Sequence, residues 1–323
     1  MRIYSLNGEQ WLMRQAGQER WRQATVPGSV YADLMRDGTL PDPFYRENEL
    51  EAFALLENDF VYQRVFEAEE TMLQSRKVLL RCEGLDTLAH VSLNGQPVGY
   101  ADNMHITWEW DVKPLLLEIR FDSPIRYALS EYEKRPGWCS TDAIPGFQHI
   151  RKAHCMFGWD WGPRLPDAGI WRPISLVCVN EVRLEDALIL QEHRDGKVFL
   201  KVTPHVECEP GAEWSWSAAL TTPEGERRPM DEDGRIVIED PQLWWPAGYG
   251  EQPLYQVCVT VDAPDGSQQW KRRIGLRTLS VSREKDQWGE EFCHIVNGVK
   301  VFAMGGDYIP EDNLLSRVTP QRT

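Results

Sequence analysis

A short aromatic and acidic segment has the residue types best suited to contact a ligand. It reads Trp159, Asp160 and Trp161, with a glycine on each side that lets the backbone turn sharply. An ionised carboxylate accepts strong hydrogen bonds from neighbouring hydroxyl groups, and indole rings offer flat apolar faces. If the segment is extended, Asp160 points away from both rings. In the alternative interpretation the carboxylate caps backbone N–H groups, and the rings pack in a core or between domains.

A second group of residues, which could bind a metal ion or a ligand, lies just upstream in the sequence. His149, His154 and Cys155 can be metal ligands, but no fourth ligand stands at zinc spacing. A polar loop without metal is therefore the expected structure, in which Arg151 can hold a carboxylate or a hydroxyl group. The sequence contains no glycine-rich phosphate loop and no Ser-His-Asp signature, so we expect no cofactor.

Composition limits the compartment and the partners. Acidic residues outnumber basic ones by 50 to 35, which argues against binding nucleic acid or an anionic membrane surface. No apolar run is long enough to cross a bilayer, and the first residues do not form a secretory signal. The seven cysteines are scattered and odd in number, so we expect mostly buried free thiols in a cytoplasmic protein.

Short strands between turn dipeptides predict an all-β fold. Asn-Gly or Asp-Gly pairs, which accept the positive φ of tight hairpins, stand at 94–95, 195–196, 233–234, 265–266 and 297–298. Alternating or apolar runs predict strands at 59–66, 78–82, 89–93, 116–121, 197–203, 214–220, 235–239, 254–261 and 274–282. A hairpin is expected at 292–302, a short helix at 29–37, and little regular structure over 124–170.

Several segments, in order, resemble glycoside hydrolase family two, and within it the β-mannosidases. They are WRQATVPGSVYADL (21–34), DPFYRENE (42–49), DFVYQRVF (59–66), CEGLDTLAHVSLNGQPVG (82–99), FGWDWGPRLPDAGIWRPISL (157–176), LWWPAGYGEQPLYQVCVTV (243–261), RRIGLRTLSVSREKD (272–286) and NGVKVFAMGGDYIPEDN (297–313). The loop over 157–176 is the most specific of them.

The resemblance implies three parts. Residues 1–180 form a galactose-binding-like jelly-roll β-sandwich, residues 181–282 an immunoglobulin-like β-sandwich, and residues 283–323 the start of a truncated (β/α)8 barrel. Such a barrel carries its catalytic site on loops after several strands, so one strand cannot build it. We therefore expect no catalytic residue in this chain, and we expect the chain alone to be inactive. Its expected partner is the missing C-terminal catalytic barrel of the same protein.

The resemblance also implies roles for particular residues. Asp160 reaches the mouth of the barrel and helps to hold a sugar, with Trp159 and Trp161 beside it. Asp307 and Tyr308 lie at the end of the first barrel strand, where substrate contacts form. Here the chain departs from the family's usual Lys-Gly-Ala-Asn-Trp-Ile-Pro, because Asp and Tyr replace Asn and Trp. The sugar preference is therefore left open.

The expected function is removal of terminal β-linked mannose from oligosaccharides by a retaining mechanism, in the full-length protein. In the resembled family the acid/base glutamate follows an asparagine. The pairs Asn48-Glu49 and Asn180-Glu181 have that form but lie in sandwich regions. Other family-two enzymes, a β-galactosidase or a β-glucuronidase, are the nearest alternatives. A stand-alone carbohydrate-binding module and a purely structural scaffold are alternatives of another class.

Overall fold

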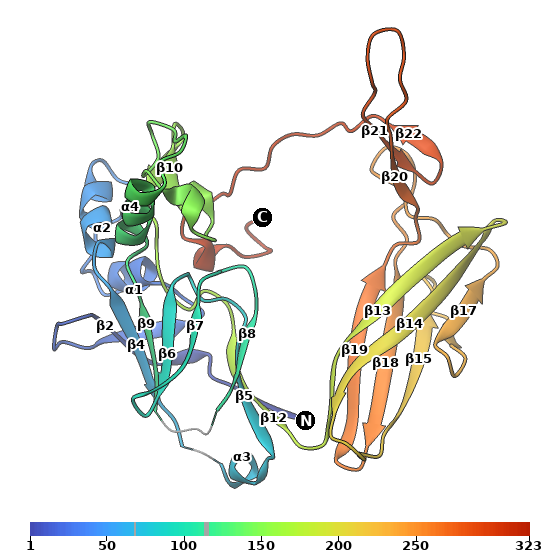
Figure 1. The fold of residues 1–323 in the computed structure, drawn as a ribbon, viewed down its shortest axis with the longest axis horizontal. Helices are drawn as coiled ribbons and strands as arrows, with labels where there is room; N and C mark the ends of the chain where they lie inside the picture. Colours follow the sequence, from blue (N-terminus) through green and yellow to red (C-terminus); the bar gives the residue numbers. More distant parts are fainter. Residues whose placement is uncertain (68, 113–115) are drawn as a thin grey trace. The chain divides into compact units, whose positions relative to one another are not determined.

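The computed structural model describes residues 1–67, 69–112 and 116–323, and its main elements are β-strands (Figure 1). They divide into two compact units. The first unit is formed by Arg2–Val179 and Tyr308–Thr323, and the second by Asn180–Asp307 together with Met1. The expected third segment, 283–323, is shared between the units, and the expected domain boundaries stay a prediction.

The first unit is built around two large antiparallel sheets. Their strands are β1 (Arg2–Ser5), β2 (Gly8–Gln15), β3 (Arg22–Val26), β4 (Phe60–Val65), β5 (Lys77–Cys82), β6 (Ala89–Leu93), β7 (Gln96–Ala101), β8 (Trp108–Asp111), β9 (Leu116–Phe121) and β12 (Ile174–Val179). Six of them form a sheet in the order β3-β2-β4-β9-β6-β7, and the other four in the order β1-β12-β5-β8. Two packed antiparallel sheets are a β-sandwich, so the all-β prediction is confirmed.

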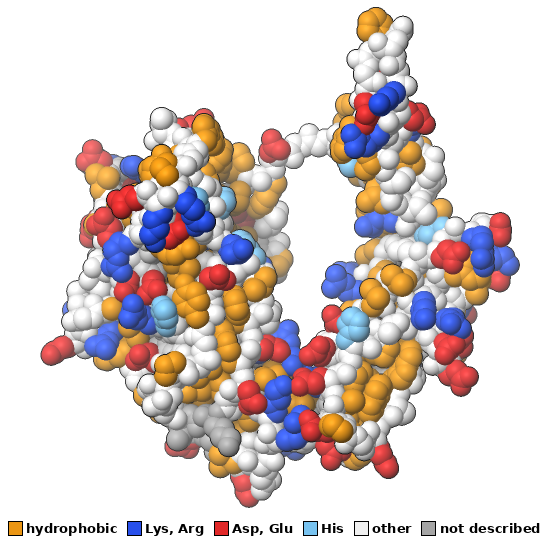
Figure 2. Space-filling model, viewed as in Figure 1, with side chains coloured by type: hydrophobic (Ala, Val, Ile, Leu, Met, Phe, Trp, Pro, Cys, Tyr) orange, Lys and Arg blue, Asp and Glu red, His pale blue; other side chains and the backbone are white. Residues whose placement is uncertain are grey.

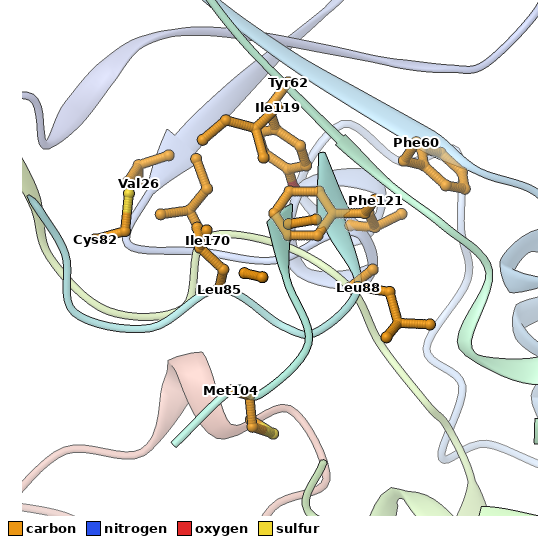
Figure 3. Close-up of a cluster of buried hydrophobic side chains, with 14 of the residues drawn as sticks. Val26, Phe60, Tyr62, Cys82, Leu85, Leu88, Met104, Ile119, Phe121 and Ile170 are labelled. Carbon is orange, nitrogen blue, oxygen red and sulfur yellow. The ribbon is translucent and has the colours of Figure 1, made fainter. Parts of the chain in front are cut away.

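The core of this unit draws side chains from both sheets. Trp11 and Met13 on β2 are fully buried while Leu12 between them is 41% exposed, the alternation of a strand with one buried face. Tyr62 and Phe121 meet edge to face from neighbouring strands, with ring centroids 5.7 Å apart (Figure 3). The strand β2 was not among those expected from the sequence, whereas the expected strand at 89–93 is β6, which shows a similar alternation of burial.

The first unit also contains helices. These are α1 (Val30–Arg36), α2 (Asn48–Leu56), α3 (Glu70–Gln74), α4 (Pro124–Lys134) and three single 3-10 turns, η1 (Phe147–His149), η2 (His154–Met156) and η3 (Leu315–Arg317). The expected helix at 29–37 is confirmed, and the Ser29 hydroxyl caps it by accepting from the Ala32 N–H. The expectation of little regular structure over 124–170 is wrong at α4, where Ser123 caps a helix that begins with proline.

The second unit consists of antiparallel strands throughout. They are β13 (Val182–Arg194), β14 (Lys197–Cys208), β15 (Ser215–Thr221), β16 (Arg227–Pro229), β17 (Arg235–Ile238), β18 (Tyr255–Ala263), β19 (Gly266–Ile274), β20 (Leu279–Ser282), β21 (Cys293–Val296) and β22 (Val299–Val301). Their sheets have the orders β13-β14-β17, β16-β15-β18-β19 and β20-β21-β22. The strand expected at 274–282 is confirmed at its end by β20, whereas β19 ends at Ile274 and the residues between are not in a strand.

Tight turns join several neighbouring strands. Both residues have positive φ in the pairs Asn94-Gly95, Asp195-Gly196 and Asn297-Gly298. These pairs close the hairpins β6–β7, β13–β14 and β21–β22. The positive φ values match the right-handed twist of the flanking strands, so the turn prediction is confirmed at these three places.

Surface features agree only in part with the sequence. Within the described ranges, no helix is long and apolar enough to cross a membrane. Acidic and basic side chains are interspersed over the viewed faces of both units (Figure 2). All seven cysteines are free, but only Cys82 and Cys178 are buried. The expectation of mostly buried thiols is therefore wrong, since Cys208, for example, lies exposed at the end of a strand.

Candidate functional site

The Trp-Asp-Trp segment forms the tip of a small hairpin. Its strands are β10 (Phe157–Trp159) and β11 (Gly162–Arg164). Trp159 pairs with the first residue of β11, so Asp160 and Trp161 are the two residues of the turn. The alternation expected of an extended segment is therefore wrong at these two positions, because a two-residue turn reverses the chain there.

The tip presents two indole rings and one carboxylate to solvent. The rings of Trp159 and Trp161 have centroids 6.2 Å apart and planes inclined by 37°. They are 40% and 45% exposed, so neither is a core residue. Asp160 is exposed, and its carboxylate accepts no hydrogen bond from the residues that the structure describes. Among the described residues, no backbone N–H group is therefore capped by the Asp160 carboxylate.

Helix α2 holds one side of the hairpin. The Glu49 carboxylate oxygen Oε1 accepts from the backbone N–H of Arg164 at 3.1 Å and from its Nε at 2.9 Å. One carboxylate thereby fixes both the backbone and the side chain of the last hairpin residue. Glu49, the acidic member of an Asn-Glu pair, is engaged in this structural contact.

A hollow of about 320 Å³ lies beside the hairpin, within the first unit. Trp161 and Phe44 supply aromatic faces, while Arg317 and Arg322 supply N–H donors and both pair with the Asp312 carboxylate. Aromatic faces with a few convergent polar groups suit a small polar ligand. Sequence reasoning missed Phe44 and both arginines, because no local pattern ties them to the Trp-Asp-Trp segment.

The expected barrel contacts lie on an extended stretch. Residues 302–310, all of them described, form neither helix nor strand. Asp307 and Tyr308 are exposed, and the division between the two units falls between them. The following residues, Ile309 and Pro310, line the hollow beside Trp161. A substrate contact by Asp307 or Tyr308 stays a prediction.

The residues upstream of the hairpin do not converge. The exposed Arg151 lies 3.8 Å from the Asp102 carboxylate, and its expected ligand contact stays a prediction. His149 contacts the carbonyl of Arg135 at 2.9 Å, whereas His154 contacts that of Ile150 at 3.2 Å. Across the described part of the chain, no three His, Cys, Asp or Glu side chains are placed to hold a metal ion.

A buried ion pair between Lys152 and Asp86 supports the loop that leads to the hairpin. Lys152 lies in the sequence between Arg151 and His154. The Lys152 side chain has no exposed surface, and its ammonium group lies 2.5 Å from both carboxylate oxygens of Asp86. It also donates to the carbonyl of Asp167 at 2.8 Å. Three donors therefore meet three acceptors, as a buried ammonium group requires. The sequence interpretation placed this segment in a polar loop and missed the pair.

The carboxyl group of Asp167 is buried in the same region. Its Oδ1 accepts from the backbone N–H groups of Tyr31 at 3.0 Å and Ala168 at 2.8 Å, whereas its Oδ2 has no partner among the described residues. Burial raises the pKa of Asp167 to about 7, because the charged form loses its hydration, and this outweighs the Ser29 hydroxyl and the two backbone N–H groups, which favour the charged form. Burial likewise raises the pKa of the nearby Asp33 to about 6, although Arg36 opposes it.

Replacing Gly158 by Ala should disturb the hairpin. Gly158 has a φ of +103°, and an added Cβ would lie 2.6 Å from the carbonyl oxygen of Asp142. We expect a loss of about 1–2 kcal/mol in stability and a changed near-ultraviolet circular dichroism of the tryptophans. Gly162→Ala is the matched control, because no atom lies within 4 Å of its added Cβ. Equal effects of the two changes would contradict this account.

Two domain families match the chain. The family described as glycosyl hydrolase 2 galactose-binding domain-like matches residues 11–172, which lie in the first unit. The family described as glycosyl hydrolases family 2 matches residues 190–277, which lie in the second unit. Together the two matches cover most of the chain, one in each unit.

Individual proteins are similar over nearly the whole chain. Beta-mannosidase B of Emericella nidulans is 32% identical over 97% of this chain and 40% of its own length. The crystal structure of a β-D-mannosidase from Dictyoglomus thermophilum matches with a TM-score of 0.88 at 32% identity, over 99% of this chain and 41% of that one. A β-D-glucuronidase from the same organism, at 16% identity and a TM-score of 0.58, shares the fold. The chain thus spans 40–41% of the length of these mannosidase relatives.

Proposed function

The chain belongs to glycoside hydrolase family 2, and from that membership we propose that it forms the non-catalytic part of a retaining β-mannosidase. The full-length protein would remove terminal β-linked mannose from oligosaccharides. The observation that carries the proposal is the likeness to a β-D-mannosidase structure over 99% of the chain at 32% identity. The exposed hairpin tip supports it, since it presents the Asp160 carboxylate and two neighbouring indole rings to solvent.

The chemistry divides between this chain and the remainder of the protein. Retaining hydrolysis needs two carboxyl groups about 5–5.5 Å apart, one to protonate the leaving oxygen and one to attack the anomeric carbon. We propose that both lie in a catalytic barrel outside this chain, since the chain spans 40–41% of the length of its mannosidase relatives and its Glu49 is bound to Arg164. In this proposal Asp160 accepts hydrogen bonds from two sugar hydroxyl groups, and Trp159 and Trp161 flank the ring.

The proposal also covers compartment and partners. Seven free cysteines suit a reducing compartment, so we place the protein in the cytoplasm. The acidic excess of 50 to 35 disfavours nucleic acid and anionic lipid as partners. The partners that remain are a β-mannoside or a related oligosaccharide and the barrel of the same protein.

A panel of nitrophenyl glycosides tests the function directly. We expect the full-length protein to cleave the β-mannoside and this 323-residue chain to cleave none. Faster cleavage of the β-galactoside or β-glucuronide would assign the protein to another specificity within the family. Turnover by the shorter chain itself would overturn the assignment of the catalytic carboxyl groups.

Replacing Asp160 by Ala in the full-length protein tests the role of the hairpin. We expect kcat/KM for the β-mannoside to fall at least about tenfold, since a charge-assisted hydrogen bond to the sugar is lost. Asp142→Ala is the control, because Asp142 is also exposed and lies in the neighbouring loop. An unchanged kcat/KM for Asp160→Ala would remove the hairpin from the site.

A further inference from the structure

The segment 311–317 is docked firmly in the first unit. Leu314 has no exposed surface and belongs to the core of that unit. Asp312 accepts from the backbone N–H of Leu314 at 2.9 Å and from Arg317 at 2.8 and 3.0 Å. Arg322 adds a bond at 2.7 Å. Burial alone would raise the pKa of Asp312, but these bonds outweigh it and hold the pKa below its ordinary value.

Between these two anchors lies Asn313, whose side chain reaches the hairpin. Its Nδ2 donates to the carbonyl of Pro163 at 3.0 Å and to the carbonyl of Cys155 at 3.3 Å. Pro163 lies within β11, and Cys155 lies just before β10 begins. An amide NH2 group has two N–H donors, so both bonds can form at once. One side chain thereby ties together the two ends of the hairpin.

The hairpin has few internal contacts to hold it in place. Its ladder consists of two residue pairs, Phe157 with Arg164 and Trp159 with Gly162. A two-stranded hairpin of this size is marginal by itself in water. Glu49 holds it from the side of α2, and the buried Asn313 holds it from the C-terminal segment. The base of the hairpin is also fixed by the buried Phe157, whose carbonyl accepts from the Ile144 N–H at 2.9 Å. Glu49 and Asn313 are the side chains that hold the strand leading away from the tip.

We infer that Asn313 is a positioning residue, which sets the orientation of the hairpin tip that carries Asp160. Asn313 is the last residue of the segment 297–313, which resembles the first barrel strand. Asn313 therefore links the start of the barrel to the sugar-contacting tip of the first sandwich. The inference rests on the proposed function, because the sugar contact of Asp160 belongs to that proposal.

The first measurement is hydrogen–deuterium exchange of the peptide 157–164 in the 323-residue chain. We compare the natural protein with Asn313→Ala and with Asn313→Asp, which keeps the shape but removes both N–H donors. The exchange rate should rise about threefold to tenfold in both variants. This factor corresponds to the net free energy of one intramolecular hydrogen bond. Asn58→Ala is the matched control, because its amide also donates to two carbonyls, those of Ala54 and Leu55, away from the hairpin.

The second measurement is the kinetics of the same variants in the full-length protein with a β-mannoside. We expect Asn313→Ala to raise KM about threefold to tenfold with kcat nearly unchanged, since a loosened tip weakens ground-state and transition-state binding alike. A merely unfolded fraction would instead lower kcat and leave KM unchanged. Asp160→Ala is measured in parallel.

The outcomes separate the inference from the function on which it rests. Unchanged exchange in both Asn313 variants overturns the inference, whatever the kinetics. Faster exchange with an intact KM, while Asp160→Ala impairs catalysis, overturns it as well. If exchange becomes faster in the Asn313 variants but Asp160→Ala leaves kcat/KM unchanged, the proposed sugar contact of the hairpin is wrong. Faster exchange with a raised KM supports both.

Discussion

Replacing Lys152 by Met is expected to destabilise the first unit by about 3–5 kcal/mol, the largest effect that we predict for this chain. The ammonium group is fully buried and contacts both oxygens of Asp86. Its removal leaves the Asp86 carboxylate buried, with the Thr87 hydroxyl as a neighbouring donor. An unpaired buried charge costs far more than the net contribution of the intact pair.

Calorimetry of the 323-residue chain measures this effect. The transition of the first unit should move down by about 6–20 °C, while that of the second unit stays in place and serves as an internal reference. Lys134→Met is the matched control, since Lys134 pairs with Glu131 at 2.8 Å but is 64% exposed. It should cost less than about 0.5 kcal/mol. A similar loss for both lysines would contradict the account.

A double variant separates the pair from its context. Replacing Asp86 by Asn in the Lys152→Met background removes the orphaned charge. It should recover a measurable part of the stability, because a neutral amide is cheaper to bury than a carboxylate. If the double variant is less stable than Lys152→Met, the Asp86 carboxylate stabilises the fold through a contact other than its pairing with Lys152.

Replacing Asp167 by Asn is expected to change how the stability of the first unit depends on pH. The folded-state pKa of Asp167 is about 7, whereas an unfolded aspartate titrates near about 3.9. Between these values the folded state binds the additional proton, so the stabilising contribution is fully present below about pH 4 and is lost as pH rises toward 7. Asp33, with a folded pKa of about 6, contributes in the same direction.

The amide introduced by Asp167→Asn mimics the protonated carboxyl group at every pH. Its oxygen can keep the bonds from the N–H groups of Tyr31 and Ala168. We therefore expect Asp167→Asn to equal the natural protein near about pH 4 and to exceed it by about 1–4 kcal/mol at about pH 8. Urea unfolding across this pH range measures the difference.

The exposed Asp142 provides the control for this pH series. Asp142→Asn alters a solvent-exposed carboxyl group of the same unit, so its stability should track that of the natural protein at every pH measured. A parallel decline of Asp167→Asn and the natural protein with rising pH would mean that Asp167 is ionised in the folded state throughout this range.

Much of the local structure follows from neighbouring residues alone. The pairs Asn94-Gly95, Asp195-Gly196 and Asn297-Gly298 accept positive φ values, which makes the hairpins predictable. Ser29 before an apolar run marks the start of α1. Alternation over 89–93 marks the buried face of β6. Each of these signals depends on backbone sterics or on periodicity within a few residues, and both are legible in the sequence.

Such reasoning fell short at the helix α4 and at the hairpin tip. Ser123 and Pro124 form a start signal for α4, and Ile125 and Ala128 share its buried face, so the helix was legible in the sequence but was not predicted. At the tip, the flanking glycines correctly indicated a turn-forming segment. Whether Asp160 and Trp161 were extended or turned depended on the pairing of β10 with β11, which the residues themselves leave open.

Residue types and their order were enough to indicate the all-β architecture, the family and the Trp-Asp-Trp segment as the candidate site. Which distant groups contact each other around that segment depends on how separate elements pack. Lys152 meets Asp86, Glu49 meets Arg164, and Asn313 meets Pro163 across 66, 115 and 150 positions of the chain. Such contacts arise when separate elements pack together, and no local preference for φ, ψ or apolar spacing encodes the partner. The contacts that define the roles of Lys152 and Asn313 therefore exist only in the folded chain.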